Sequence, residues 1–211
     1  MTAVKSRPGR WQDPGVARVK NQTLRRAELI EAASRALLDR GVAGLRLKDV
    51  AEQAGLTPGS VLYYYADVEE LLTEVFGQGT RHYCDGREKR VARAGGVRDR
   101  LRACIASGVP YPGEPAGASQ VLYELMPVVV RHARGAALYG EFFDRQAALY
   151  EGVLADGARS GELRLTGDAA DLARGFVALE DGFGILVLTG AETPESVERR
   201  LLEYARVVAG L

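Results

Sequence analysis

Apolar residues recur every three or four positions along most of the chain from Asn21 onward. The first stretch places Leu24, Ala27, Ile30, Ala33 and Leu37 on one face. This spacing predicts an amphipathic helix that ends at Gly41. The same pattern predicts helices over 47–54, 58–64, from 67 onward, 97–108, 116–125, 127–160 (broken near 134–135), 168–188 and 194–209. No segment alternates as a β-strand does, so we expect an all-α fold.

Two of the predicted helices carry clear start signals. Asp67 can cap the helix that follows it, and Glu70 three residues later completes a capping box. Thr193 followed by Pro194 is a typical N-cap and first helical position. These signals place a helix start at each position.

The composition excludes several classes of protein. Apolar residues make up 46% of the chain and charged residues 27%, as in a globular domain. The apolar run 182–191 is half of the roughly twenty residues that cross a bilayer, and the N-terminus lacks the apolar core of a signal peptide. We therefore expect a cytoplasmic protein with no membrane segment. Cys84 and Cys104 fit small packing residues better than a disulfide framework.

The formal charge of zero hides an asymmetry between the two ends of the chain. Residues 1–66 contain 11 Lys and Arg against 6 Asp and Glu, whereas residues 67–211 contain 17 against 22. A basic N-terminal region and an acidic C-terminal region indicate that only the N-terminal region binds the phosphates of a nucleic acid. Residues 1–20 have five basic residues and no helical period, so we expect a mobile basic arm that reaches DNA, or else a solvated tail or cloning remnant.

The segment 47–65 has the pattern of a helix-turn-helix. Ala51 supplies the small residue at the crossing of two short helices, and Gly55 supplies the positive φ that the turn requires. Thr57 can cap the second helix, which leaves its start narrow enough for a major groove. Four apolar residues are placed to close a small core against the first helix: Val50, Ala54, Leu56 and Val61. A generic helical hairpin is the alternative.

The stretch 55–71, Gly-Leu-Thr-Pro-Gly-Ser-Val-Leu-Tyr-Tyr-Tyr-Ala-Asp-Val-Glu-Glu-Leu, resembles the signature of the TetR family of bacterial regulators. The resemblance is close over 22–76, and beyond that only length and helix layout match. It implies a three-helix DNA-binding domain over 21–66 and a helical domain over 67–211 that dimerises and encloses an effector pocket.

The resemblance also implies roles for individual residues. It assigns DNA contacts to Lys48, Thr57, Pro58, Gly59, Ser60, Tyr63 and Tyr64, and a core position to Tyr65. Arg46 and Leu62 are candidate contacts by their own chemistry, because a guanidinium can meet the DNA backbone and an apolar group a thymine methyl. Three positions depart from the family pattern. Leu62 replaces a usual Tyr, Val68 replaces a common Lys, and Arg46 replaces a Ser or Thr cap. Phosphate affinity is therefore expected to depend on Arg46, Lys48 and the basic arm.

No catalytic or metal-binding pattern is present in the sequence. His82 and His132 lie far apart without a second ligand at helical spacing, and neither cysteine has a catalytic partner motif beside it. We therefore expect no enzyme activity, no metal and no cofactor. The alternatives are a helical small-ligand carrier or enzyme with a vestigial DNA module, and a protein-interaction domain.

Aromatic and apolar residues with a few polar ones on the middle helices have the composition of a small-molecule pocket. The predicted lining is Tyr123, Met126, Arg131, Tyr139, Phe143, Phe176, Glu180 and Phe183, with Tyr111, Phe142, Tyr150, His132, Asp144 and Asp181 as further candidates. Packing in the core is the alternative for each. Glu180 and Asp181 interrupt an apolar helix, so either one pairs with an arginine or one faces a ligand.

Small residues along 168–188 allow close helix approach, so we expect this helix and 194–209 to form a four-helix homodimer interface. Two-fold symmetry then predicts a pseudo-palindromic operator. The hypothesis is a repressor that a small-molecule effector releases from double-stranded DNA; activation is the other possibility. Effector and operator are not readable from the sequence.

Overall fold

The computed structural model describes residues 14–211, with side chains from Gln22 onward except that of Glu114. Within this range the chain forms helices and no strand, which confirms the all-α prediction. The helices are α1 (Pro14–Gly44), α2 (Leu47–Gln53), α3 (Pro58–Leu62), α4 (Val68–Arg93), α5 (Val97–Gly108), α6 (Glu114–Val129), α7 (Ala133–Ser160), α8 (Ala169–Leu188) and α9 (Pro194–Ala209).

The structure corrects the predicted start of α1 and one of its core positions. Residues 14–20 are helical, so the expectation of a helix-free arm through residue 20 was wrong for that part, and residues 1–13 lie outside the described residues. Pro14 suits the first position of a helix, because a backbone N–H at that position has no acceptor within the helix and proline lacks this group. The predicted stop at Gly41 is confirmed as a break with φ of 69°. Leu24, expected on the buried face, is 55% exposed, and Leu29 occupies the core instead.

The boundary between α6 and α7 also differs from the prediction. A helix was expected to begin at Pro127, but Pro127 lies inside α6, and α7 begins at Ala133. Leu125 and Val129, one turn apart on α6, are both buried in the same core. Their burial offsets the one backbone hydrogen bond that proline removes.

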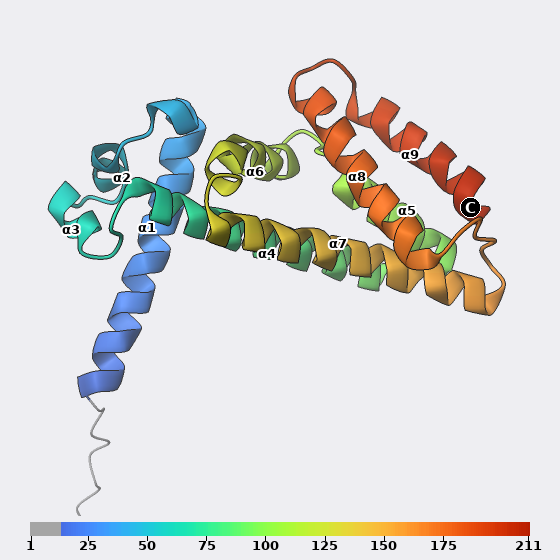
Figure 1. The fold of residues 1–211 in the computed structure, drawn as a ribbon, viewed down its shortest axis with the longest axis horizontal. Helices are drawn as coiled ribbons and strands as arrows, with labels where there is room; N and C mark the ends of the chain where they lie inside the picture. The colour runs from blue at the N-terminus through green and yellow to red at the C-terminus, as the bar shows by residue number, and fades with distance from the viewer. Residues whose placement is uncertain (1–13) are drawn as a thin grey trace, which may run out of the picture.

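The helices form an elongated molecule with two ends (Figure 1). At one end the short helix α2 packs on α1 and α3 packs on α2, and α8 and α9 lie at the other end. The long helices α4 and α7 run side by side between the two ends, and α6 packs on α4 and α1. Among the described residues, no helix is both long and apolar enough to cross a bilayer.

Buried side chains fall into two clusters. The first, called the N-terminal core below, joins α1, α2 and α3 to the first half of α4 and to α6, with Leu29, Val61, Tyr65, Phe76 and Leu125 among its members. The second, the C-terminal core, joins α5, α7, α8 and α9, with Ile105, Tyr150, Leu154, Phe176 and Leu201 among its members. Each cluster is a separate apolar unit.

Candidate functional site

The segment 47–65 folds as the predicted helix-turn-helix. Gly55 has φ of 66°, the left-handed conformation that the turn requires. Thr57 is the N-cap of α3, and its Oγ1 accepts a hydrogen bond from the Ser60 backbone N–H at 3.2 Å. The Leu56 backbone N–H donates to the Ala51 carbonyl at 2.8 Å, which closes the turn. Local sequence signals therefore set the geometry of this element.

A small core holds the element against α1. Val50, Ala51 and Val61 are fully buried, and Ala54 and Leu56 pack beside them as predicted. Tyr65 is also buried, with the Arg26 guanidinium 4.4 Å from its ring centre. The Arg26 side chain donates to the Tyr64 carbonyl at 2.9 Å, so it connects α1 to the end of the element. Burial raises the pKa of Tyr65 to about 12, which agrees with its predicted core position.

The residues predicted to meet DNA lie on the outer surface of this element. Tyr63 is 64% exposed and Leu62 is 49% exposed. The others are exposed or half-buried: Arg46, Lys48, Thr57, Pro58, Gly59, Ser60 and Tyr64. Ser60, Tyr63 and Tyr64 surround a shallow hollow together with Arg25, a residue that the sequence analysis missed. Their contacts with DNA remain a prediction.

The start of α2 keeps half of a capping box despite Arg46. The Asp49 carboxylate accepts a hydrogen bond from the Arg46 backbone N–H at 2.9 Å. Asp49 is buried, and Arg40 pairs with it at 3.3 Å. The Arg46 side chain makes no capping bond, so its exposed guanidinium faces outward.

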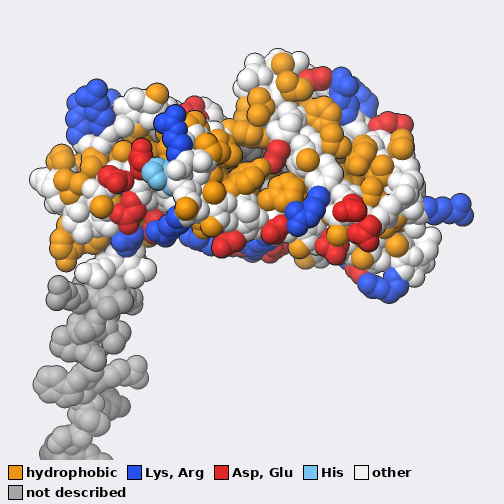
Figure 2. All heavy atoms as spheres, in the orientation of Figure 1, with side chains coloured by type: hydrophobic (Ala, Val, Ile, Leu, Met, Phe, Trp, Pro, Cys, Tyr) orange, Lys and Arg blue, Asp and Glu red, His pale blue; other side chains and the backbone are white. Residues whose placement is uncertain are grey.

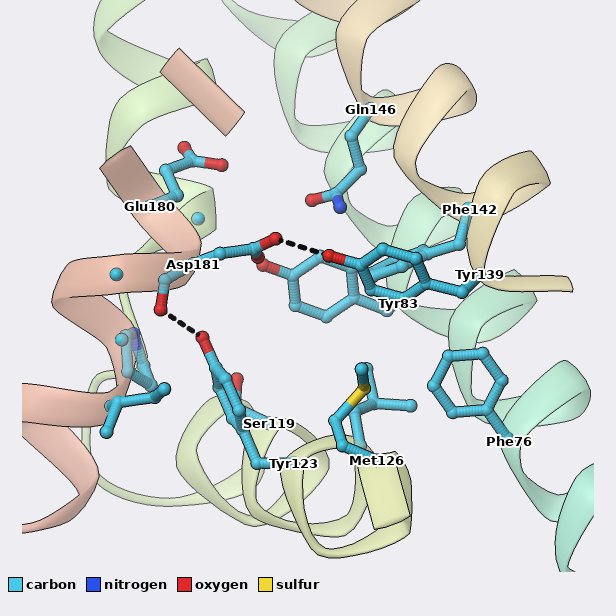
Figure 3. Close-up of a pocket in the computed structure, with 16 residues that line it drawn as sticks. Phe76, Tyr83, Ser119, Tyr123, Met126, Tyr139, Phe142, Gln146, Glu180 and Asp181 are labelled. Atoms are coloured by element: carbon cyan, nitrogen blue, oxygen red, sulfur yellow. Dashed lines mark hydrogen bonds between the residues drawn. The ribbon is translucent and has the colours of Figure 1, made fainter. Parts of the chain in front are cut away.

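A cavity of about 320 Å³ lies between α4, α6, α7 and α8, next to the end of α5. Its lining is Phe76, Tyr83, Gly108, Pro110, Ser119, Leu122, Tyr123, Met126, Tyr139, Phe142, Gln146, Glu180, Asp181, Gly182, Gly184 and Ile185. Figure 3 shows Phe76 and Met126 on one side of it and the two acidic residues of α8 on the other. Figure 2 shows apolar side chains gathered in the notch where α6 and α8 meet.

Asp181 is the carboxylate on the cavity wall that hydroxyl groups surround. The Tyr139 hydroxyl donates to Asp181 Oδ2 at 3.0 Å, and the Tyr123 hydroxyl donates to the Asp181 carbonyl at 2.7 Å (Figure 3). Burial raises the pKa of Asp181 above its ordinary value, and it raises the pKa values of Tyr83 and Tyr139 to about 12. In the part of the chain that the structure describes, no ion pair to Asp181 is found.

Glu180, the neighbouring acid, is instead fully engaged. The Arg87 guanidinium donates to both of its carboxylate oxygens at 2.8 and 2.9 Å, and the Tyr150 hydroxyl donates to Oε1. Arg87 also donates to the Gln146 side-chain carbonyl at 2.5 Å and to the Cys104 carbonyl at 3.0 Å. Arg87 and Glu180 are 3% and 4% exposed, so this is a buried ion pair that joins α4, α5, α7 and α8.

The network depends on a glycine in α5. A Cβ at Gly108 would lie 2.0 Å from Glu180 Oε1, which is far inside contact distance. Only glycine at this position therefore lets the Glu180 carboxylate reach Arg87 beside α5.

Four of the eight predicted lining residues line the cavity: Tyr123, Met126, Tyr139 and Glu180. The other four do not, which corrects the prediction. Phe176 is fully buried and stacks on Tyr150 in the C-terminal core. Phe143 and Phe183 pack against that core, and Arg131 is exposed in the turn before α7. The three phenylalanines share helices with lining residues but lie on other faces, which apolar periodicity alone does not distinguish, whereas Arg131 lies between α6 and α7.

Several lining residues on α4 and α7 were not predicted from the sequence. Phe76 and Tyr83 lie two turns apart on α4, and Gln146 lies on α7. The seven-residue spacing of Phe76 and Tyr83 on one helix is a signal that was available. Cys84 and Cys104 are buried and free, as expected for packing residues. Among the described residues, no cluster of metal-ligating side chains occurs.

Comparison with known proteins settles the family. Residues 97–209 match the family described as "BetI-type transcriptional repressor, C-terminal". The chain belongs to the TetR family. Residues 29–75 match the description "Bacterial regulatory proteins, tetR family", which covers the helix-turn-helix. The TetR resemblance of the sequence is thus confirmed.

An individual relative from the TetR family matches less than half of this chain. The HTH-type transcriptional regulator BetI of Burkholderia ambifaria is 33% identical over 91 residues, which are 43% of this chain and 47% of that protein. The chain therefore spans about half the length of the curated relatives that head the comparison.

Two solved structures share the fold. A transcriptional regulator from Saccharomonospora viridis in complex with choline superposes with a TM-score of 0.78 at 23% identity, covering 86% of this chain and 95% of that one. A TetR transcription regulator from Haloarcula marismortui has a TM-score of 0.79 at 20% identity, covering 89% and 99%. The TetR fold therefore extends over most of the chain and is not confined to the helix-turn-helix region.

Proposed function

We propose that this chain is a cytoplasmic, dimeric DNA-binding repressor that an organic cation releases from its operator. The observation that carries the cation is Asp181, a carboxylate without an ion pair among the described residues, in a cavity lined by aromatic rings. The helix-turn-helix and the TetR family support DNA binding.

The charges around the cavity favour a ligand with one positive charge. Arg87 compensates Glu180, so Asp181 is left as the net negative group on the wall. Tyr83, Tyr139 and Phe142 add aromatic rings beside it. A cation near such rings gains about 0.5–2 kcal/mol per favourable contact, more when it is desolvated. The cavity volume suits a small molecule, and choline, the ligand of the Saccharomonospora viridis regulator, has this chemistry.

The dimer is expected to form through α8 and α9. Ala178, Gly182, Ile185 and Leu186 follow one face of α8, and all four are exposed in the single chain. Small and apolar residues at this spacing allow two copies of α8 to approach closely. With α9 beside it, this face supports the predicted four-helix interface and therefore a two-fold symmetric operator.

Helix α6 offers a route from the cavity to the helix-turn-helix. Tyr123 and Met126 line the cavity, and Glu124 between them points to α1 instead. Glu124 Oε2 accepts a hydrogen bond from the Val42 backbone N–H at 3.1 Å, beside the break at Gly41. A ligand that moves α6 would therefore move the C-terminal end of α1. Release requires that the ligand bind the DNA-incompetent state more tightly.

The DNA-binding half of the proposal is tested by selecting fragments of the source genome with purified full-length protein. At low salt and without ligand, the protein should enrich a two-fold symmetric site, with affinity that falls steeply as salt rises. Enrichment of no symmetric site would reject the repressor function and favour a carrier or enzyme with a vestigial DNA module.

The ligand half is tested by calorimetry with a matched pair, choline and its uncharged isostere 3,3-dimethylbutan-1-ol. Choline should bind at least tenfold more tightly, because only it can interact electrostatically with Asp181. Its affinity should fall on acidification toward the raised pKa of Asp181, since protonation removes the carboxylate charge. Equal binding of the pair at neutral pH would exclude a cation-specific site.

A further inference from the structure

Gln146 on α7 carries a buried hydrogen-bond donor that nothing in the described structure accepts. The side chain is 3% exposed, and its Nε2 has no hydrogen-bond partner. A buried amide group left unpaired costs about 1–3 kcal/mol. Such a cost at the wall of a ligand cavity indicates a group that a ligand completes.

The orientation of the amide follows from its neighbour. Arg87 Nη1 donates to Gln146 Oε1 at 2.5 Å, and a guanidinium has no acceptor. The carbonyl oxygen must therefore face Arg87, which leaves the NH₂ group on the other side. Figure 3 shows the amide end of Gln146 pointing toward the rings of Tyr83 and Tyr139 in the cavity.

The surrounding charges limit what the donor can bind. Arg87 Nη1 also donates to Glu180 Oε2 at 2.8 Å, so a carboxylate lies close to Gln146. Arg87 compensates that carboxylate, so Asp181 on the same wall is the net negative charge beside the donor. A ligand carboxylate would be repelled there, whereas an uncharged oxygen would accept the Nε2–H without that penalty.

We propose that Gln146 is a specificity-determining residue of the cavity, and that the effector carries an uncharged oxygen acceptor, such as a hydroxyl, in addition to its cationic group. The inference rests on the proposed function, because it assumes that the cavity holds an effector. It defines the ligand class as a small amino alcohol or a close analogue, held at Asp181 by charge and at Gln146 by a hydrogen bond.

The test is calorimetry on the full-length protein with three probes of one head group: choline, ethyltrimethylammonium and glycine betaine. The wild type should bind choline about tenfold more tightly than ethyltrimethylammonium, which lacks the hydroxyl, and should bind betaine, which carries a carboxylate, more weakly than choline. Equal affinity for choline and ethyltrimethylammonium would overturn the proposal in the wild type alone, without any variant.

The variant Gln146→Met then assigns the preference to this side chain. It should reduce the preference for choline to less than twofold while leaving ethyltrimethylammonium within about twofold of the wild type. A merely structural role would weaken both probes equally, and an unchanged preference would show that another group reads the hydroxyl. Either result rejects the role of Gln146.

The neutral alcohol 3,3-dimethylbutan-1-ol separates this inference from the proposed function. If the alcohol binds as well as choline and Gln146→Met weakens its binding, the requirement for a cationic ligand is rejected and the hydrogen bond from Gln146 to the ligand is supported. If choline binds far more tightly than the alcohol but no more tightly than ethyltrimethylammonium, the requirement for a cationic ligand is supported and the hydrogen bond from Gln146 is rejected. Binding by none of the probes rejects both.

Discussion

The two cores of the molecule differ in the polar groups that they bury and in how those groups are paired. In the C-terminal core, the Arg87–Glu180 pair is surrounded by partners from four helices. In the N-terminal core, the Tyr65 hydroxyl is buried with no partner in the described structure. The C-terminal core is therefore held together by a buried ion pair with partners from four helices as well as by apolar packing, whereas in the N-terminal core Asp49 pairs with an exposed Arg40 and joins α1 and α2 alone.

The ligand cavity lies where these two cores meet. Phe76, Leu122 and Met126 on its wall belong to the N-terminal core or pack against it, whereas Gln146 and Glu180 belong to the polar network of the other. A ligand in this cavity contacts both units at once. The proposed effector would therefore bind at the junction of the two cores.

The largest effect is expected when the polar network is broken. Arg87→Met leaves Glu180 buried without its cation, so the free energy of unfolding should fall by about 3–5 kcal/mol. Urea unfolding at a fixed protein concentration measures it, because the stability of a dimer depends on concentration. The control Arg206→Met removes an exposed pair with Glu203 and should cost less than about 1 kcal/mol.

Removing both charges of the buried Arg87–Glu180 pair tests the same difference between the two cores. The double variant with Arg87→Met and Glu180→Leu should recover part of the lost stability, because no buried charge remains unpaired. A loss of stability in Arg87→Met no larger than in the control would show that the network does not hold the C-terminal core.

The surface of the N-terminal region that is predicted to bind DNA should respond independently of the cavity. Arg46→Ala with Lys48→Ala should weaken binding to the selected operator at least tenfold, and should lower the salt dependence by roughly one unit of log–log slope per lost phosphate contact. Fluorescence anisotropy over a range of salt concentrations measures both. Lys89→Ala, an exposed lysine on α4, is the matched control. An unchanged slope in the double variant would remove both residues from the phosphate contacts.

Communication between the two regions is tested at Glu124. Glu124→Ala should leave choline affinity within about threefold and reduce the choline-induced weakening of operator binding by at least threefold, since coupling energies are typically about 1–3 kcal/mol. Glu124→Gln keeps an oxygen acceptor for the Val42 N–H and should retain coupling. Gln120→Ala changes an exposed residue of the same helix and serves as control. Full coupling in Glu124→Ala would exclude this route.

The smallest effect is expected in the N-terminal core. Tyr65→Phe removes a buried hydroxyl that has no partner, so the free energy of unfolding should stay within about 1 kcal/mol of the wild type or rise. Thermal and urea unfolding measure it. A loss above about 2 kcal/mol would show that the hydroxyl is satisfied in the folded protein, and the contrast between the two cores would not hold.

The sequence predicted the N-terminal region well because its contacts are local. Gly55, Thr57 and Asp67 act on residues within a few positions along the chain, as their φ angle and capping bonds show. Turn and cap chemistry of this kind is readable from spacing alone. Tyr65 was likewise assigned correctly to the core.

The cavity was predicted only in part because its contacts are remote. Arg87 and Glu180 are 93 positions apart, and Arg87 and Gln146 are 59 apart. Periodicity identifies an apolar face but not which neighbouring helix covers it, so Phe176 was placed in the pocket and Tyr83 was missed. Of the two alternatives for the adjacent acids, the pairing with an arginine is confirmed for Glu180, whereas Asp181 faces the cavity and its contact with a ligand stays a prediction.

The most direct test of the account is release of the operator by a cation that Asp181 recognises. Anisotropy of the labelled operator should show that choline dissociates the wild-type complex, that 3,3-dimethylbutan-1-ol does not, and that Asp181→Asn keeps DNA binding but loses the choline response. Asparagine still accepts from the Tyr139 hydroxyl, so only the charge changes. Equal release of wild type and Asp181→Asn by choline, or no release by any concentration of choline, would contradict the account.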